Sequence, residues 1–178
     1  MNKNIVLDLD GVIADIASSI EDRLWDTYGI DRGVYDYSHW LTTHHDCDDS
    51  EKIMGSPLFW KNLKPFEDAW HQVNYWFSSN YDVYIVTARR SDAAIRNTQS
   101  WLDNWRIATM PPIFANMGEK HKIINEIMPL FIVEDNPNEV ITLLEEGHNA
   151  YLKKAWYNEK YWNELPAIDS LLELEIND

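Results

Sequence analysis

Three short apolar runs along the chain predict buried β-strands, and each run stops abruptly at polar residues. The runs are residues 5–7, 81–86 and 130–133, and they are rich in β-branched and aromatic side chains. Asp8 follows the first run, Thr87 the second and Glu134 the third. Carboxylates and a hydroxyl are therefore expected at the carboxyl ends of three strands.

Between these runs, apolar residues recur at spacings of three and four, which predicts amphipathic helices. Pro65 suits a first helical position, and an apolar stripe follows it as far as Phe77. Lys120 opens another predicted helix, and Asn136-Pro137 is typical of a helix cap. Strands that alternate with helices predict an α/β fold with a Rossmann-like, mostly parallel sheet and a ligand site beyond the strands' carboxyl ends.

Residues 14–64 break this alternation, because they contain helix formers and aromatic residues but no further strand before Pro65. We interpret them as a small helical cap inserted after the first strand. The α/β core domain would then comprise residues 1–13 and 65–178.

The net charge of the chain limits the kinds of molecule that it is expected to bind. The formal net charge of −15 disfavours nucleic acid polymers and anionic membranes. A small phosphate compound stays compatible, because a divalent cation reverses the potential locally. Cys47 is the single cysteine, which indicates a reducing compartment, and the N-terminal residues include no apolar stretch of membrane-spanning length. We expect a cytoplasmic protein, with monomer and homodimer both open.

Asp8 and Asp10 are the first candidate chemical pair. In an extended segment their side chains project to the same side, so one could hold a cation while the other handles protons. Gly11 allows the backbone to turn sharply next to a ligand. The alternative is an Asp-rich turn after a strand, and other residues must decide between the two.

Those residues are Thr87, Lys120 and the pair Glu134-Asp135, which follow in order at the predicted strand and helix ends. With Asp8-Leu9-Asp10-Gly11-Val12 as a first motif, the chain resembles the haloacid dehalogenase-like superfamily. The resemblance implies that Asp8 attacks phosphorus and forms an aspartyl-phosphate, while Asp10 serves as general acid and then as general base.

The same resemblance implies the surrounding ligands. Mg²⁺ would be held by Asp8, the backbone carbonyl of Asp10 and Asp135, with Glu134 supporting them, although Glu134 could replace Asp135. The phosphoryl oxygens would be bound by Thr87, Ala88 and Lys120. Lys122 is expected to face solvent, and Asp15 to cap the following helix.

Residues 56–69, which include Phe59-Trp60 and Asn62-Leu63, resemble the 5′(3′)-deoxyribonucleotidase family. A departure lies at Thr87-Ala88-Arg89, where that family carries Thr-Ser-Pro. Phe59, Trp60 and Trp40 are candidates to stack on a nucleobase, or else they pack the cap onto the core. Arg89 either reaches the substrate or pairs with the surplus acids.

The expected activity is therefore Mg²⁺-dependent dephosphorylation of nucleoside monophosphates, with deoxyribonucleoside 5′-monophosphates as the leading substrates. One alternative keeps the chemistry but changes the substrate to a sugar phosphate or another small phosphate ester. The other is a catalytically inactive phosphate-binding module. All motif positions are filled, which favours an enzyme.

Overall fold

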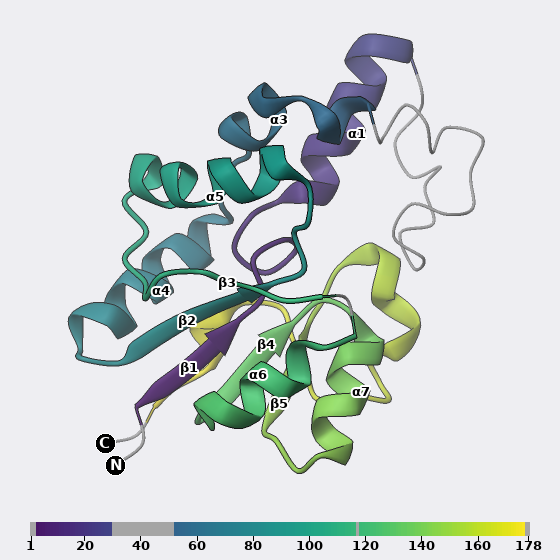
Figure 1. Cartoon of the computed structure of the whole chain (residues 1–178). Coiled ribbons are helices and arrows are strands. Elements are labelled where there is room, and N and C mark those ends of the chain that lie inside the picture. Colours follow the sequence, from purple (N-terminus) through teal and green to yellow (C-terminus); the bar gives the residue numbers. More distant parts are fainter. Residues whose placement is uncertain (1–2, 30–51, 117, 177–178) are drawn as a thin grey trace.

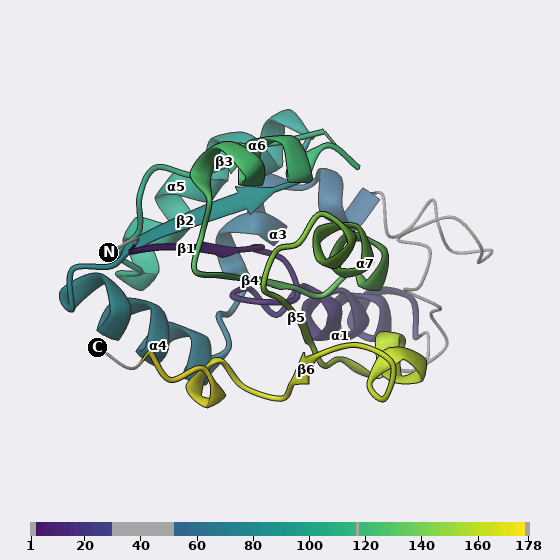
Figure 2. The same cartoon turned by 90° about the horizontal axis from the view of Figure 1, so that it is seen from below.

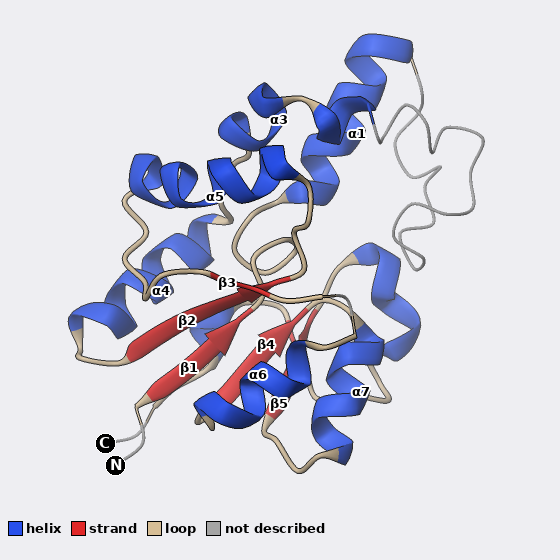
Figure 3. Ribbon diagram, in the orientation of Figure 1, coloured by secondary structure: helices blue, strands red, loops and turns tan. Residues whose placement is uncertain are grey.

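The computed structural model describes residues 3–29, 52–116 and 118–176. Its centre is a six-stranded sheet with the strand order β3-β2-β1-β4-β5-β6, in which neighbouring strands run parallel (Figures 1 and 3). The strands are β1 (Asn4–Leu7), β2 (Asp82–Thr87), β3 (Ile113–Phe114), β4 (Phe131–Glu134), β5 (Ala150–Lys153) and β6 (Ala167–Ile168). The predicted α/β class with a parallel sheet is confirmed.

Helices cover both faces of the sheet, as Figure 2 shows. They are α1 (Ile16–Tyr28), α3 (Pro57–Asn62), α4 (Glu67–Ser78), α5 (Asp92–Trp105), α6 (Lys120–Ile127) and α7 (Pro137–Glu145), followed by the 3₁₀ turns η2 (Trp156–Tyr161) and η3 (Leu171–Glu173). Alternate residues of β1 point to opposite faces: Ile5 and Leu7 pack in the cluster that includes α4 and α5, whereas Val6 packs with α6 and α7. Burial on both faces explains why the strands read as continuous apolar runs.

The strand order places β1 at the centre of the sheet. β1 pairs with β2 on one side and with β4 on the other. The carboxyl ends of these three strands therefore meet at the point where the order reverses, which is where ligands bind in open α/β sheets. The three strands predicted from the sequence are the three that form this junction.

Helix α4 begins later than the sequence suggested. Its first residue is Glu67, not Pro65, and Phe66 occupies the N-cap position. Pro65 forms an isolated antiparallel bridge with Ala14 instead, and the Phe66 amide donates to the Ile13 carbonyl at 2.9 Å. These contacts hold Pro65 and Phe66 in an extended connection before the helix.

Helices α1 and α3 lie beyond the carboxyl ends of the strands (Figure 1). Asp15 caps α1 as predicted, because its side chain accepts a hydrogen bond from the Ser18 amide. The end of α3 is tied to α5, since the indole groups of Trp101 and Trp105 both donate to the Leu63 carbonyl, at 2.8 and 3.0 Å. No helix among the described residues is long and apolar enough to span a membrane.

Candidate active site

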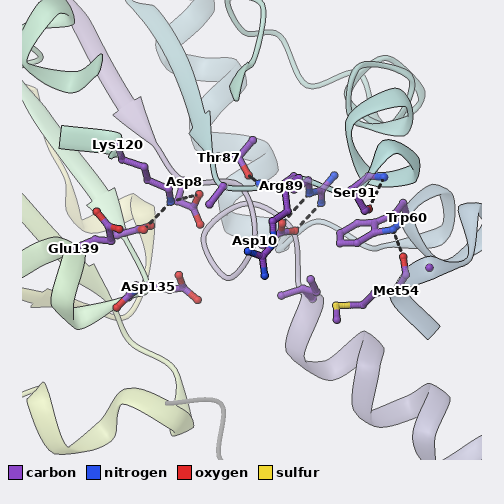
Figure 4. A pocket seen from close by; sticks show the side chains of 17 residues that line it. Asp8, Asp10, Met54, Trp60, Thr87, Arg89, Ser91, Lys120, Asp135 and Glu139 are labelled. Carbon is purple, nitrogen blue, oxygen red and sulfur yellow. Dashed lines mark hydrogen bonds and ion pairs between the residues drawn. The ribbon is translucent and has the colours of Figure 1, made fainter. Parts of the chain in front are cut away.

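Asp8 lies at the end of the central strand, where the sheet holds its backbone in place. Its amide donates to the Val133 carbonyl of β4 at 2.9 Å. Lys120, the first residue of α6, reaches across the strand ends, and its Nζ donates to Asp8 Oδ1 and to Glu134 Oε1, at 2.7 Å each. One ammonium group therefore bridges two buried carboxylates, as Figure 4 shows for Asp8.

Burial dominates the electrostatics of this group. It raises the pKa of Asp8 and, more strongly, that of Glu134, although the Lys120 ammonium opposes the rise in both. For Lys120 itself burial would lower the pKa, but the carboxylates of Asp8 and Glu134 outweigh burial and raise it. The ammonium is thus held charged between acids that would otherwise repel one another.

Asp135 directly follows β4, and its carboxylate lies within 4.8 Å of the Asp8 carboxylate. Burial and the Asp8 charge raise the pKa of Asp135 to about 7. The Tyr157 hydroxyl donates to Asp135 Oδ2, and the Asn158 side chain donates to the Asp135 carbonyl at 2.9 Å. Turn η2 therefore fixes both the backbone and the carboxylate of Asp135.

The donor set fits a hard divalent cation. Carboxylate oxygens of Asp8, Glu134 and Asp135 lie within 4.8 Å of one another, the range needed to share one ion. Glu134 Oε2 is buried without a hydrogen-bond partner among the described residues. A buried acceptor of this kind is costly unless a cation or water satisfies it. Mg²⁺, which prefers oxygen ligands, matches these observations.

Gly11 follows the two aspartates, and its backbone needs both a positive φ and the absence of a side chain. Its φ is +84°, and a Cβ atom would overlap the Asp135 carboxylate and the Tyr157 hydroxyl. Gly147 has a similar φ of +86° but nothing within 4 Å of a Cβ atom. A substitution at Gly147 therefore tests the cost of the positive φ alone, whereas one at Gly11 adds the cost of crowding Asp135.

We expect Gly147→Ala to lower the free energy of unfolding by about 1–2 kcal/mol, the usual cost of a left-handed alanine. Gly11→Ala should cost more than that, because it must also displace Asp135. Urea unfolding of both variants measures the difference. Only Gly11→Ala should weaken Mg²⁺ binding, measured by calorimetry, and equal Mg²⁺ affinities would contradict the close approach of Gly11 to Asp135.

Asp10 lies on the opposite side of the pocket from Lys120, where its carboxylate pairs with Arg89 (Figure 4). Of the two alternatives for Arg89, reaching the substrate or pairing with an acid, the structure shows the pairing. The Thr87 side chain is buried at the end of β2, and its hydroxyl accepts from the Arg89 amide at 3.3 Å. Thr87 and Ala88 both line the pocket.

The pocket has a volume of about 330 Å³, which suits a small organic phosphate. Trp60 of α3 and Met54 also line it, and the Trp60 indole donates to the Met54 carbonyl. Phe59 is buried but does not line the pocket; its ring packs edge-on against Trp60. Trp40 lies outside the described residues. The base-stacking roles of these aromatic residues stay predictions.

Glu139 is a pocket residue that the sequence analysis missed. It is buried in the first turn of α7, and its carboxylate accepts from the Gly118 amide at 3.1 Å. A signal was available, because the predicted cap at Asn136 places the first turn of the helix directly after the Glu134-Asp135 pair. Lys122, by contrast, is exposed and pairs with Glu119 as expected from helical geometry.

Solved structures share this fold. A haloacid dehalogenase-like family hydrolase from Streptococcus pneumoniae superposes with a TM-score of 0.62 at 15% identity, covering 96% of this chain and 95% of its own. CbbY from Rhodobacter sphaeroides, solved with phosphate, gives 0.64 at 12% identity, covering 98% and 96%. A HAD family IA hydrolase from Entamoeba histolytica gives 0.62 at 12% identity, with the same coverage. No family model and no curated protein matches the sequence.

These likenesses define the class of structure: the chain has the fold of the haloacid dehalogenase-like hydrolases over almost its full length. At identities of 12–15% they establish the fold alone.

Proposed function

We propose that this chain is a phosphohydrolase that cleaves small phosphate monoesters through an aspartyl-phosphate on Asp8. One observation carries the proposal. Asp8, Asp10, Thr87, Lys120 and Asp135 come from four separate parts of the sequence and all line one pocket at the carboxyl ends of the strands. The arrangement supplies a nucleophile, a proton carrier and phosphate ligands together.

The reaction would proceed in two displacements. In the first, a carboxylate oxygen of Asp8 forms a bond to phosphorus as the ester P–O bond breaks, and the proton of the Asp10 carboxyl group passes to the departing oxygen to give an alcohol. In the second, water attacks phosphorus, its proton passes to Asp10, and the bond between Asp8 and phosphorus breaks. Inorganic phosphate leaves, and Asp10 is again protonated for the next cycle.

The other residues bind and neutralise the phosphoryl group. Lys120 and Thr87 would bind its oxygens. Five acidic and three basic residues line the pocket, so a dianion needs additional positive charge. Mg²⁺ held by Asp8, the Asp10 carbonyl and Asp135, with Glu134 supporting them, would supply that charge. Tyr157 and Asn158 keep Asp135 oriented for this role.

For the substrate we propose nucleoside monophosphates, with deoxyribonucleoside 5′-monophosphates first. The support is the resemblance of residues 56–69 to the deoxyribonucleotidases and the presence of Trp60 from that segment in the pocket wall. A sugar phosphate is the second candidate. It is favoured by the fold neighbour CbbY, which has also been solved with xylulose-1,5-bisphosphate.

A panel of phosphate esters tests both candidates. We expect Mg²⁺-dependent release of inorganic phosphate, abolished by EDTA. The value of kcat/KM should be at least about tenfold higher for a deoxyribonucleoside 5′-monophosphate than for pentose and hexose phosphates, a difference of about 1.4 kcal/mol in transition-state free energy. The opposite ranking would replace the nucleotide by the sugar phosphate. No release from any ester, with Mg²⁺ present and the protein folded, would leave the inactive phosphate-binding module.

A further inference from the structure

Arg89 and Asp10 form a buried, two-bond ion pair on the cap side of the pocket. Arg89 Nε donates to Asp10 Oδ2 at 2.7 Å, and Nη2 donates to Asp10 Oδ1 at 2.6 Å. The side chains are only 2% and 11% exposed. Two parallel bonds between planar groups fix the plane of the carboxylate as well as its position, which a single bond to an ammonium group does not do.

The guanidinium group is itself held on two other sides. Nη1 donates to the Thr98 hydroxyl of α5 at 3.0 Å, and that hydroxyl donates onward to the Ala94 carbonyl at 2.8 Å. The Trp60 ring of α3 lies under the guanidinium, with its centroid 4.6 Å from Cζ. Arg89 is therefore held by α5 and α3, so the position of the Asp10 carboxylate depends on where both helices lie.

This geometry leaves Arg89 poorly placed to bind a phosphate directly. Each of its three nitrogens already has a partner in the protein, and one face of the group is covered by Trp60. These bonds use three of the five N–H groups, but the side chain is only 2% exposed, so moving the guanidinium onto a substrate phosphate would break its pairing with Asp10 and leave a buried carboxylate unpaired. The cation on the far side of the pocket, Lys120, contacts Asp8 and is the better phosphate ligand.

We propose that Arg89 is a positioning residue that holds the Asp10 carboxyl group facing the pocket, and that it acts on the reaction through Asp10 and not by binding the substrate. The inference rests on the proposed function, because it assumes that Asp10 exchanges protons with the leaving group and with water. Each Asp10 oxygen accepts one bond from Arg89, which leaves its second lone pair available for a proton or a water molecule.

The role makes a prediction that depends on the leaving group. Arg89→Lys keeps the positive charge but loses the two-bond geometry, so kcat for a nucleoside 5′-monophosphate should fall about 100-fold, the lower end of what a positioned acid–base group contributes. KM should change by less than about threefold. With p-nitrophenyl phosphate, whose leaving group needs no proton, the first turnover should stay near the wild-type rate.

Rapid mixing with p-nitrophenyl phosphate measures this directly. The Arg89→Lys enzyme should release a burst of about one nitrophenolate per active site and then turn over slowly, because water activation by Asp10 is still impaired. A direct phosphate ligand would behave differently: both substrates would lose rate in the first turnover, or the loss would appear in KM. Either result would overturn the proposal.

Two further variants serve as controls. One tests the same role in case Arg89→Lys misfolds, and the other tests for a non-specific effect of charge. Thr98→Val removes the hydroxyl that braces Arg89 while keeping the side-chain volume, and it should lower kcat for the nucleotide about five- to tenfold with the same burst behaviour. Arg96→Gln removes one positive charge from the exposed face of the same helix, where Arg96 pairs with Asp92, and should leave both rates unchanged. An unaltered nucleotide kcat in both Arg89→Lys and Thr98→Val refutes the inference alone, whereas an inactive wild-type enzyme refutes the proposed function.

Discussion

Replacing Asp8 by Asn should lower kcat by at least about 10⁴-fold on every phosphate ester that the wild-type enzyme cleaves, the scale of loss found when a nucleophile is removed. The amide keeps the shape of the side chain but cannot form the bond to phosphorus. Steady-state release of inorganic phosphate measures the loss. Acid quenching of the wild-type enzyme with ³²P-labelled substrate should trap label on the protein, and the variant should trap none.

The same variant should keep its fold, which makes the loss of turnover interpretable. Burial and the neighbouring Asp10 raise the pKa of Asp8, so the ionised carboxylate is unfavourable in the metal-free protein. Lys120 keeps Glu134 as its ion-pair partner in the variant, so removing the Asp8 charge should leave the free energy of unfolding unchanged or increase it slightly in urea titrations with EDTA. A folded Asp8→Asn variant that still turns over would assign the nucleophile to another group.

The central part of the fold and most of the candidate site could be read from the sequence because both depend on local patterns. Strands buried on both faces read as apolar runs, and parallel strands bring their carboxyl ends to one edge. Asp8, Thr87 and Glu134 were therefore expected to lie near one another, and they line the same pocket. Lys120 was expected there from the resemblance to the haloacid dehalogenase-like superfamily, and it lines the same pocket.

Elements without a local pattern were not predicted. Strands β3 and β6 have two residues each, too short to show periodicity, and their pairing with neighbours defines them. The start of α4 moved from Pro65 to Glu67 because Pro65 pairs with Ala14, a contact across 51 positions that local signals do not report.

The partner of Arg89 could not be decided either. Its long side chain reaches several directions, and the choice between substrate and acid depends on where Thr98 and Trp60 lie. Those positions follow from the packing of α5 and α3, which no run of residues near Arg89 encodes. The base-stacking role of Trp60 is open for the same reason, because one face of its ring contacts the guanidinium.

Lys120 offers the largest expected effect on stability. Lys120→Met keeps most of the side-chain volume but leaves Asp8 and Glu134 buried without their shared cation. Removing one partner of a buried ion pair costs about 3–5 kcal/mol, because the remaining charge is uncompensated. We expect a loss of this size in the free energy of unfolding at about pH 8, measured by urea titration in EDTA. Lys122→Met is the matched control: Lys122 is exposed and pairs with Glu119, so its loss should be within about 0.5 kcal/mol.

The loss in Lys120→Met should depend on pH, and its sign follows from the two acids. Burial already raises the pKa of Asp8 and Glu134 above their ordinary values of 3.8 and 4.5, and without the ammonium both should rise further. An acid with a raised pKa binds a proton on folding, so its destabilising effect is absent below its ordinary pKa and grows as pH rises through the folded value. The deficit should therefore be small near pH 4 and full near pH 8. A deficit of equal size at both pH values would mean that Lys120 stabilises the fold by packing and not by compensating the carboxylates.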